Sequence, residues 1–129
     1  MKKFKVSTRK AALHKLWSKA VRKRDKFLCQ WCLYDGKKNY NPSHHAHHIM
    51  SKAISGNVGR FDIDNGMTLC MYHHKNMKEC YPDEYIVFRD WWLAQRRMNY
   101  DDMRFNYNEC FTKFTPEFYD MKKIVLMED

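Results

Sequence analysis

The chain has 129 residues and a formal charge of +9 at pH 7, from 24 lysines and arginines against 15 aspartates and glutamates. Hydrophobic residues make up 44% of it and aromatic residues 16%, which suffices for a folded core and excludes a wholly disordered chain. The length predicts one domain over 1–129. The positive charge favours a polyanionic partner. Nucleic acid is preferred to anionic membrane, because the aromatic residues are spread along the chain rather than gathered on one basic amphipathic helix.

The first residues, MKKFKVSTRK, have the charges of a secretion signal without an apolar run behind them, and no stretch reaches the roughly 18 apolar residues of a membrane span. We therefore expect a cytoplasmic protein without a membrane partner. A helix is predicted over 8–26, where one face collects Leu13, Leu16, Trp17, Ala20 and Val21. The other face is basic and is either a solvated surface or a phosphate-facing one; it holds Lys10, Lys15, Lys19, Arg22, Lys23 and Arg24. His14, alone on this helix, is expected to be a surface residue.

The segment 27–80 combines cysteines, histidines and turn residues. FLCQWCLYDG closes on a turn at Asp35 and Gly36, and 37–66 predicts a hairpin and a long loop around a short strand near 46–50. Strand alternation would place His44 and Ala46 on the face of His48, and His45 on the face of His47. His44 and His45 could supply a further metal contact or simply coat the strand, and we expect neither to be essential. A short helix is predicted from about 70 to 79.

The segment 81–129 predicts further helices. One begins at Pro82 and runs to about 98, with Tyr85, Phe88 and Trp92 on one face. The stretch 100–114 is aromatic and receives no assignment. Another helix begins at Pro116 after an N-capping Thr115, and its expected buried stripe consists of Phe118, Met121, Ile124 and Val125. Cys80 and Cys110 are expected to be small core residues, with a substitute metal ligand as the alternative for Cys80.

Four side chains have the types and spacing of a zinc site. Cys29 and Cys32 are two residues apart, and Cys70 and His73 repeat that spacing later in the chain. An odd total of five cysteines also suits metal or thiol chemistry better than a disulfide framework. A thiol oxidoreductase is the weaker alternative, because no βαβ pattern surrounds the CxxC. Adjacent helical residues point about 100° apart, so His74 would face away from the zinc and could serve a second metal centre.

The segment from roughly 24 to 79 contains CxxC, then AHHI, then an asparagine before LCMYHH. In these motifs and their order it resembles the HNH endonucleases. The segments LWSKAVRKRDKFLCQWC, HIMSK, RFDIDN and WW also resemble the phage recombination-associated NinG-type group. The resemblance implies that His48 is the general base and that His47 and His74 bind a catalytic divalent ion. It implies that Asn65 holds the hairpin and the base in position. The chain departs from the common pattern at His73, where a fourth cysteine is usual, and at His47, where an aspartate is commoner.

The resemblance implies an α+β, mostly helical fold: a ββα-metal (His-Me finger) core with a zinc knuckle at 27–80, flanked by the basic helix and a C-terminal helical extension at 81–129. It implies metal-dependent hydrolysis of DNA in a bacterial or phage-infected cell, with a homodimer or a phage recombination protein as further partners. The cofactors would be a structural zinc and a catalytic Mg²⁺, Mn²⁺, Ni²⁺, Co²⁺ or Zn²⁺, with imidazole ligands favouring the softer ions. A zinc-knuckle nucleic-acid-binding module without catalysis is the alternative.

Phosphate contacts are expected from basic residues near the base and on the first helix. Arg60 is a candidate beside the scissile bond, although pairing with Asp62 or Asp64 would explain it equally well. The other expected DNA contacts are Lys52, Lys19, Arg22 and Lys23.

Overall fold

The computed structural model describes residues 5–36, 44–110 and 112–128. The fold is mostly helical α+β, as predicted. Its elements are α1 (Val6–Arg24), α2 (Gln30–Tyr34), β1 (His44–His48), α3 (Lys52–Arg60), the 3₁₀ turn η1 (Ile63–Asn65), β2 (Gly66–Cys70), α4 (Met71–Cys80), α5 (Pro82–Gln95), α6 (Tyr100–Glu109) and α7 (Pro116–Met127).

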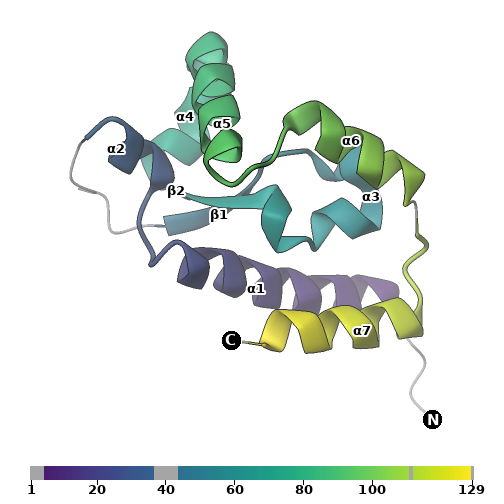
Figure 1. Cartoon of the computed structure of the whole chain (residues 1–129). Helices are drawn as coiled ribbons and strands as arrows, with labels where there is room; N and C mark the ends of the chain where they lie inside the picture. Colours follow the sequence, from purple (N-terminus) through teal and green to yellow (C-terminus); the bar gives the residue numbers. More distant parts are fainter. Residues whose placement is uncertain (1–4, 37–43, 111, 129) are drawn as a thin grey trace.

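A two-stranded antiparallel sheet lies at the centre of the molecule. His48 of β1 faces Gly66 of β2 across the ladder, and His44 faces Cys70. In Figure 1, α1 and α7 run side by side along one face of this sheet, while α4 and α5 lie on the other. The order β1, β2, α4 gives the ββα arrangement that the sequence predicted.

Helix α1 packs on the sheet through the apolar face that the periodicity predicted. Leu13, Trp17 and Val21 are fully buried. Gly66 makes this close approach possible, because a Cβ there would lie 2.5 Å from Val21 Cγ2 and 2.8 Å from the Trp17 ring. Any larger residue at this position therefore has to push α1 away from the strand.

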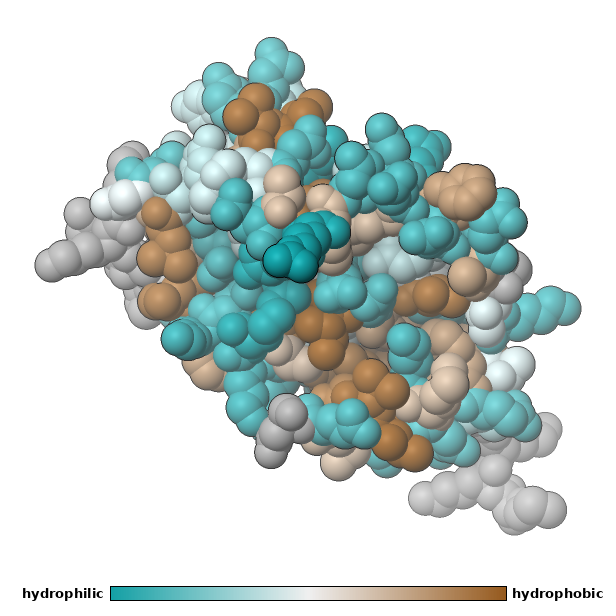
Figure 2. Space-filling model, in the orientation of Figure 1, coloured by the Kyte–Doolittle hydropathy of each residue, from teal (hydrophilic) through white to brown (hydrophobic). Residues whose placement is uncertain are grey.

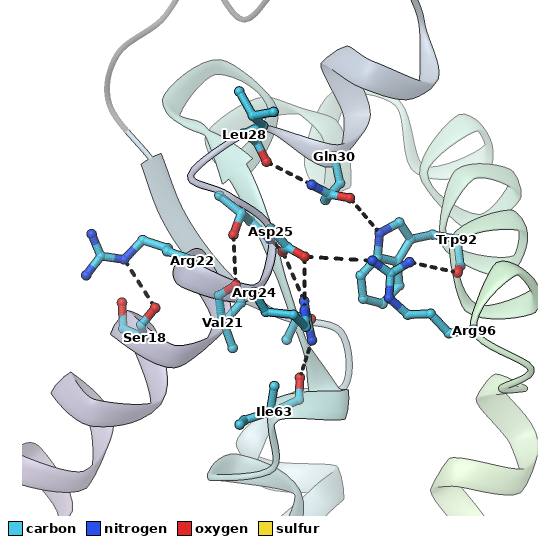
Figure 3. Close-up of polar contacts among 12 residues, drawn as sticks. Ser18, Val21, Arg22, Arg24, Asp25, Leu28, Gln30, Ile63, Trp92 and Arg96 are labelled. Carbon is cyan, nitrogen blue, oxygen red and sulfur yellow. Dashed lines mark hydrogen bonds and ion pairs between the residues drawn. The ribbon is translucent and has the colours of Figure 1, made fainter. Parts of the chain in front are cut away.

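A buried ion pair ties the end of α1 to the rest of the fold (Figure 3). The Asp25 carboxylate accepts hydrogen bonds from the Arg24 guanidinium at 2.9 and 3.0 Å and from the backbone N–H of Thr68 in β2 at 2.8 Å. Arg24 also donates to the carbonyl oxygens of Ile63 and Gly66, and Arg96 at the end of α5 lies 3.7 Å from Asp25. Arg24 is therefore occupied within the fold rather than part of a free basic face.

Two expectations about the helical segments were wrong, and one stretch that received no assignment is helical. The loop expected between 37 and 66 contains α3, and the unassigned stretch contains α6, which begins at an N-capping Asn99 that accepts from the backbone N–H groups of Asp101 and Asp102. Helix α7 buries Phe118, Tyr119 and Leu126 against α1. The rest of its expected stripe is exposed: Met121, Ile124 and Val125 are 55%, 64% and 44% accessible.

The exposed apolar side chains of α7 follow from this packing. The α1 contact covers only a narrow strip of the helix, so its remaining hydrophobic residues face outward. In Figure 2 brown, apolar surface is visible in the lower part of the molecule, where Figure 1 draws α7.

Candidate active site and metal centre

Four buried side chains from three elements converge beside the sheet. Cys29 caps α2 and Cys32 lies within it, Cys70 ends β2, and His73 lies in the first turn of α4. The Nδ1 atom of His73 is 3.2, 3.5 and 3.4 Å from the sulfurs of Cys29, Cys32 and Cys70. The four ligand atoms all lie within 4.8 Å of one another. The expected convergence of these residues is confirmed.

This donor set fits a tetrahedral zinc ion. Zinc–sulfur bonds of about 2.3 Å put sulfur ligands about 3.8 Å apart, and the Cys32 and Cys70 sulfurs are 4.0 Å apart. Burial raises the pKa of the Cys32 thiol, and the charges of Cys29 and Cys70 raise it further. Burial also raises the pKa of Cys29. Because burial disfavours the charged thiolate form, the cysteines would bind as thiolates only together with a cation, and Zn²⁺ could supply that charge.

The two neighbouring histidines of β1 point to opposite faces of the sheet, because strand side chains alternate. His48 faces α1, where its ring stacks on Trp17 with centroids 3.9 Å apart and planes 8° from parallel. His47 is buried on the other face, beside α5 and α4. His45 shares this second face, as alternation predicted, and stacks on His74 with ring centroids 5.2 Å apart.

The hydrogen bond of His48 defines its tautomer. Nε2 lies 2.9 Å from the carbonyl oxygen of Arg60, and a carbonyl only accepts, so Nε2 carries the hydrogen. Burial lowers the pKa of His48 to about 4, and the positive charges of Lys52 and Arg60 act in the same direction. The ring is therefore neutral near pH 7, with its lone pair on Nδ1.

Asn65 joins the two ends of the segment between the strands. Its amide donates to the carbonyl oxygens of Met50 and Gly59 at 3.0 and 2.9 Å, and its side-chain oxygen accepts from the N–H of Met50 at 2.8 Å. Gly59 precedes Arg60, whose carbonyl accepts from His48. The fully buried Asn65 thus holds the backbone that orients this histidine.

His47 has an orienting partner of its own. Its Nε2 lies 2.6 Å from the hydroxyl oxygen of Tyr85 in α5. Burial raises the pKa of Tyr85, so the phenol stays neutral. If the Nε2–H donates to Tyr85, Nδ1 keeps the lone pair that a metal ligand needs. The His74 ring lies 5.6 Å from the His47 ring, centroid to centroid.

One cleft of about 320 Å³ brings these side chains together. It is lined by His47, His48 and His74 with Ala46, Ser51, Lys52, Lys75 and Glu79. A larger cleft of about 580 Å³ lies beside Trp31 and Tyr34 but contains none of these three histidines. Of the expected DNA contacts, Lys52 alone lines the histidine cleft.

The remaining basic candidates lie elsewhere. Lys19 and Lys23 line a groove between α1 and α7, and Arg22 Nε donates to the carbonyl oxygen of Ser18. Arg60 lies over the Phe61 ring, 5.1 Å from its centroid, and its Nε is buried without a hydrogen-bond partner. Among the described residues Arg60 forms no ion pair with Asp62 or Asp64, whose carboxylates interact with Tyr107 and with Arg24 and Arg96.

Sequence reasoning was wrong about three residues near or beside the site. His14 is half-buried, with its ring 5.9 Å from that of His48, rather than a surface residue. Cys80 and Cys110 are exposed, not core residues. Trp17 and Tyr85 were expected only as buried helix positions. Their sequence signal is that of core packing, and which histidine each one contacts depends on the tertiary fold.

Comparison with known families agrees with this geometry. Residues 29–78 match the family model described as HNH endonuclease, a range that holds the four zinc-site residues, both strands and the cleft histidines. No curated protein and no solved structure matches the chain. No helix within the described ranges is long and apolar enough to cross a membrane.

Proposed function

We propose that this chain, which carries an HNH endonuclease domain at residues 29–78, is a metal-dependent nuclease that hydrolyses DNA phosphodiester bonds. One observation carries the proposal. A single cleft holds a neutral histidine with its lone pair on Nδ1 and two further histidines from the strand and the following helix. The net charge of +9 suits a polyanionic substrate.

His48 acts as the general base. Its Nδ1 takes a proton from the attacking water, and the imidazolium that forms is stabilised through its Nε2–H bond to the Arg60 carbonyl. Stacking on Trp17 keeps the ring in one orientation. The low pKa keeps the base unprotonated near neutral pH, and a bound phosphate, being negative, would raise it and strengthen the base.

His47 and His74 hold the catalytic divalent ion. Two imidazoles fit Mn²⁺, Co²⁺, Ni²⁺ or Zn²⁺ better than Mg²⁺, which prefers oxygen ligands. When bound, such an ion neutralises charge on the phosphate oxygens and on the leaving oxygen. Tyr85 orients His47, and Asn65 orients His48 through the backbone that it holds.

The structural zinc of Cys29, Cys32, Cys70 and His73 fastens α4, and therefore His74, to β2 and α2. Lys52 and Arg60 contact DNA phosphates near the cleft, and Lys19, Arg22 and Lys23 contact the duplex farther along α1. A homodimer, a phage recombination partner and a cytoplasmic location stay predictions.

The cluster and the positive charge would also serve a zinc-knuckle module that binds nucleic acid without cutting it. Supercoiled plasmid incubated with zinc-loaded protein and Mg²⁺, Mn²⁺, Ni²⁺, Co²⁺ or Zn²⁺ separates the two functions. We expect nicked or linear DNA. His48→Ala should slow cleavage by about 10²- to 10⁴-fold with DNA binding retained, and His74→Ala should abolish the metal response. His44→Ala, on the same strand, is the control. Binding without cleavage under every ion would leave the binding module as the function.

A further inference from the structure

The face of α1 that meets β1 places a second histidine beside His48. His14 and Trp17 lie one helical turn apart, and the His14 ring is 5.6 Å from Trp17 and 5.9 Å from His48, centroid to centroid. His14 lies outside residues 29–78, which match the family model. It belongs to α1, which precedes them in the chain and packs on both strands of the sheet.

The two ring nitrogens of His14 have different environments. Nδ1 is buried without a hydrogen-bond partner. The ring as a whole is half-buried, so its exposed edge carries Nε2. Burial lowers the pKa of His14, and the charges of Lys52 and Arg60 lower it further, so the ring is neutral. A hydrogen on the enclosed Nδ1 would have no acceptor, so the favoured tautomer carries it on Nε2, where it can be donated outward.

The charges around this donor are all of one sign. Lys52 at the start of α3 and Arg60 at its end act on both His14 and His48, and no carboxylate is among the groups that shift either pKa. Arg60 Nε is, like His14 Nδ1, buried without a partner. Two cations and an outward N–H donor therefore gather beside the base, and among the described residues no carboxylate pairs with Arg60 or shifts the pKa of either histidine, although Glu79 lines the same cleft as Lys52. Cations and an N–H donor are the groups that a phosphate requires.

We propose that His14, Lys52 and Arg60 form a phosphate-binding site that holds a backbone phosphate of the DNA strand next to the one at which His48 acts. His14 contributes its neutral Nε2–H, while Lys52 and Arg60 contribute charge. This inference rests on the proposed function, since it assigns a substrate contact to the same site. It makes α1 part of the substrate-binding surface through its sheet-facing edge, whereas Lys19 and Lys23 line the groove beside α7.

Three substitutions of His14 separate binding from packing. His14→Phe keeps a ring beside Trp17 and His48, removes both nitrogens and changes no charge. His14→Gln keeps a donor near the Nε2 position, and His14→Ala removes the ring. Affinity for a short fluorescent duplex is measured by anisotropy with protein that holds one equivalent of zinc and with no free divalent ion, so that the DNA stays intact.

We expect His14→Phe to fold with an unfolding temperature no lower than that of the parent protein, because it removes a buried unpaired nitrogen. Its DNA affinity should nevertheless fall about 10- to 100-fold, as expected for losing a hydrogen bond to a charged group. His14→Gln should recover most of that loss. The slope of log K against log salt should stay unchanged in His14→Phe, whereas Lys52→Gln and Arg60→Gln should each reduce it by about 0.9.

Parent-like DNA affinity in a folded His14→Phe would overturn the inference. If His14→Phe does not fold, parent-like affinity in His14→Ala overturns it equally. Plasmid cleavage by the parent protein is scored separately. If the parent protein cleaves DNA and the His14 variants bind DNA with parent-like affinity, the nuclease proposal stands and only the phosphate site is removed. If the parent protein does not cleave DNA but His14→Phe binds it more weakly, the nuclease proposal falls and the phosphate site remains.

Discussion

Replacing Cys70 with serine should release the zinc ion and unfold the part of the protein that carries His74. Cys70 is buried at the end of β2, with its sulfur 3.4 Å from His73 Nδ1 and 4.0 Å from the Cys32 sulfur. A serine hydroxyl is a far poorer ligand for zinc than a thiolate. The remaining three ligands come from α2 and α4, and α2 has only five residues. So short a helix has no stability of its own.

The size of the effect follows from the ligand count. Four-ligand structural zinc sites in small domains contribute about 10–16 kcal/mol of apparent binding free energy near pH 7. A whole domain is stable by only about 5–15 kcal/mol. Losing the ion therefore removes an amount of free energy comparable to the whole stability of the fold, so we expect loss of helical circular dichroism as well as loss of metal.

Counting reactive thiols tests this directly. Cys29, Cys32 and Cys70 are buried, while Cys80 and Cys110 are exposed. In zinc-loaded protein a disulfide thiol reagent should modify the two exposed cysteines rapidly and the other three slowly. After chelation all five should react rapidly. Cys70→Ser should expose every remaining thiol at once and contain no stoichiometric zinc.

Cys110→Ser is the matched control, because it removes an exposed thiol at the end of α6. It should lose one rapidly reacting group and keep the zinc content and unfolding temperature of the parent protein. The reasoning is refuted if Cys70→Ser retains one equivalent of zinc with parent-like stability, or if all five thiols of the zinc-loaded protein react at one rate.

Three other substitutions probe the supports of the site. Tyr85→Phe should lower the affinity for the catalytic ion by about 10- to 100-fold. Half-maximal cleavage would then need a higher metal concentration, with the structural zinc content unchanged; an unchanged metal response would refute the orienting role of Tyr85. Gly66→Ala should lower the free energy of unfolding, measured in urea, by about 1–3 kcal/mol, because the added Cβ would collide with α1. Asp25→Asn should lower the free energy of unfolding by about 3–5 kcal/mol, because it leaves the Arg24 charge without its buried partner. Its control is Asp90→Asn, which breaks an exposed pair and should cost no more than about 1 kcal/mol; equal costs would contradict the argument.

The sequence predicted those features that depend on local spacing. The zinc cluster could be read from CxxC and CxxH, and the helices at 6–24, 82–95 and 116–127 from apolar periodicity and from Thr115 followed by proline. Strand alternation correctly separated His48 from His47 and His45. The prediction that His74 turns away from the zinc site also holds, since it lies against the β1 histidines instead.

Features that depend on tertiary packing could not be read in this way. In α3 a non-helical Gly56 interrupts the periodicity, with φ of 65° and ψ of −162°. Asn99 before two aspartates was a usable signal for the start of α6, but the aromatic residues after it obscured the pattern. Helix α7 contains more apolar residues than one face can hold, so only contact with α1 decides which are buried. The position of His14 beside His48 depends in the same way on the packing of α1 against β1.

The alternation of a strand explains why two adjacent histidines can have different chemical roles. His48 and His47 are covalent neighbours, yet one meets Trp17 and the Arg60 carbonyl, and the other meets Tyr85 and the ring of His74. Each imidazole therefore has its own hydrogen-bond partner at Nε2, the Arg60 carbonyl for His48 and the Tyr85 hydroxyl for His47. Because the cleft lies where β1 ends, both side chains reach it in spite of leaving the strand on opposite faces. The proposed proton acceptor and the proposed metal ligand are thus adjacent in sequence, and each is held by a support that can be mutated independently.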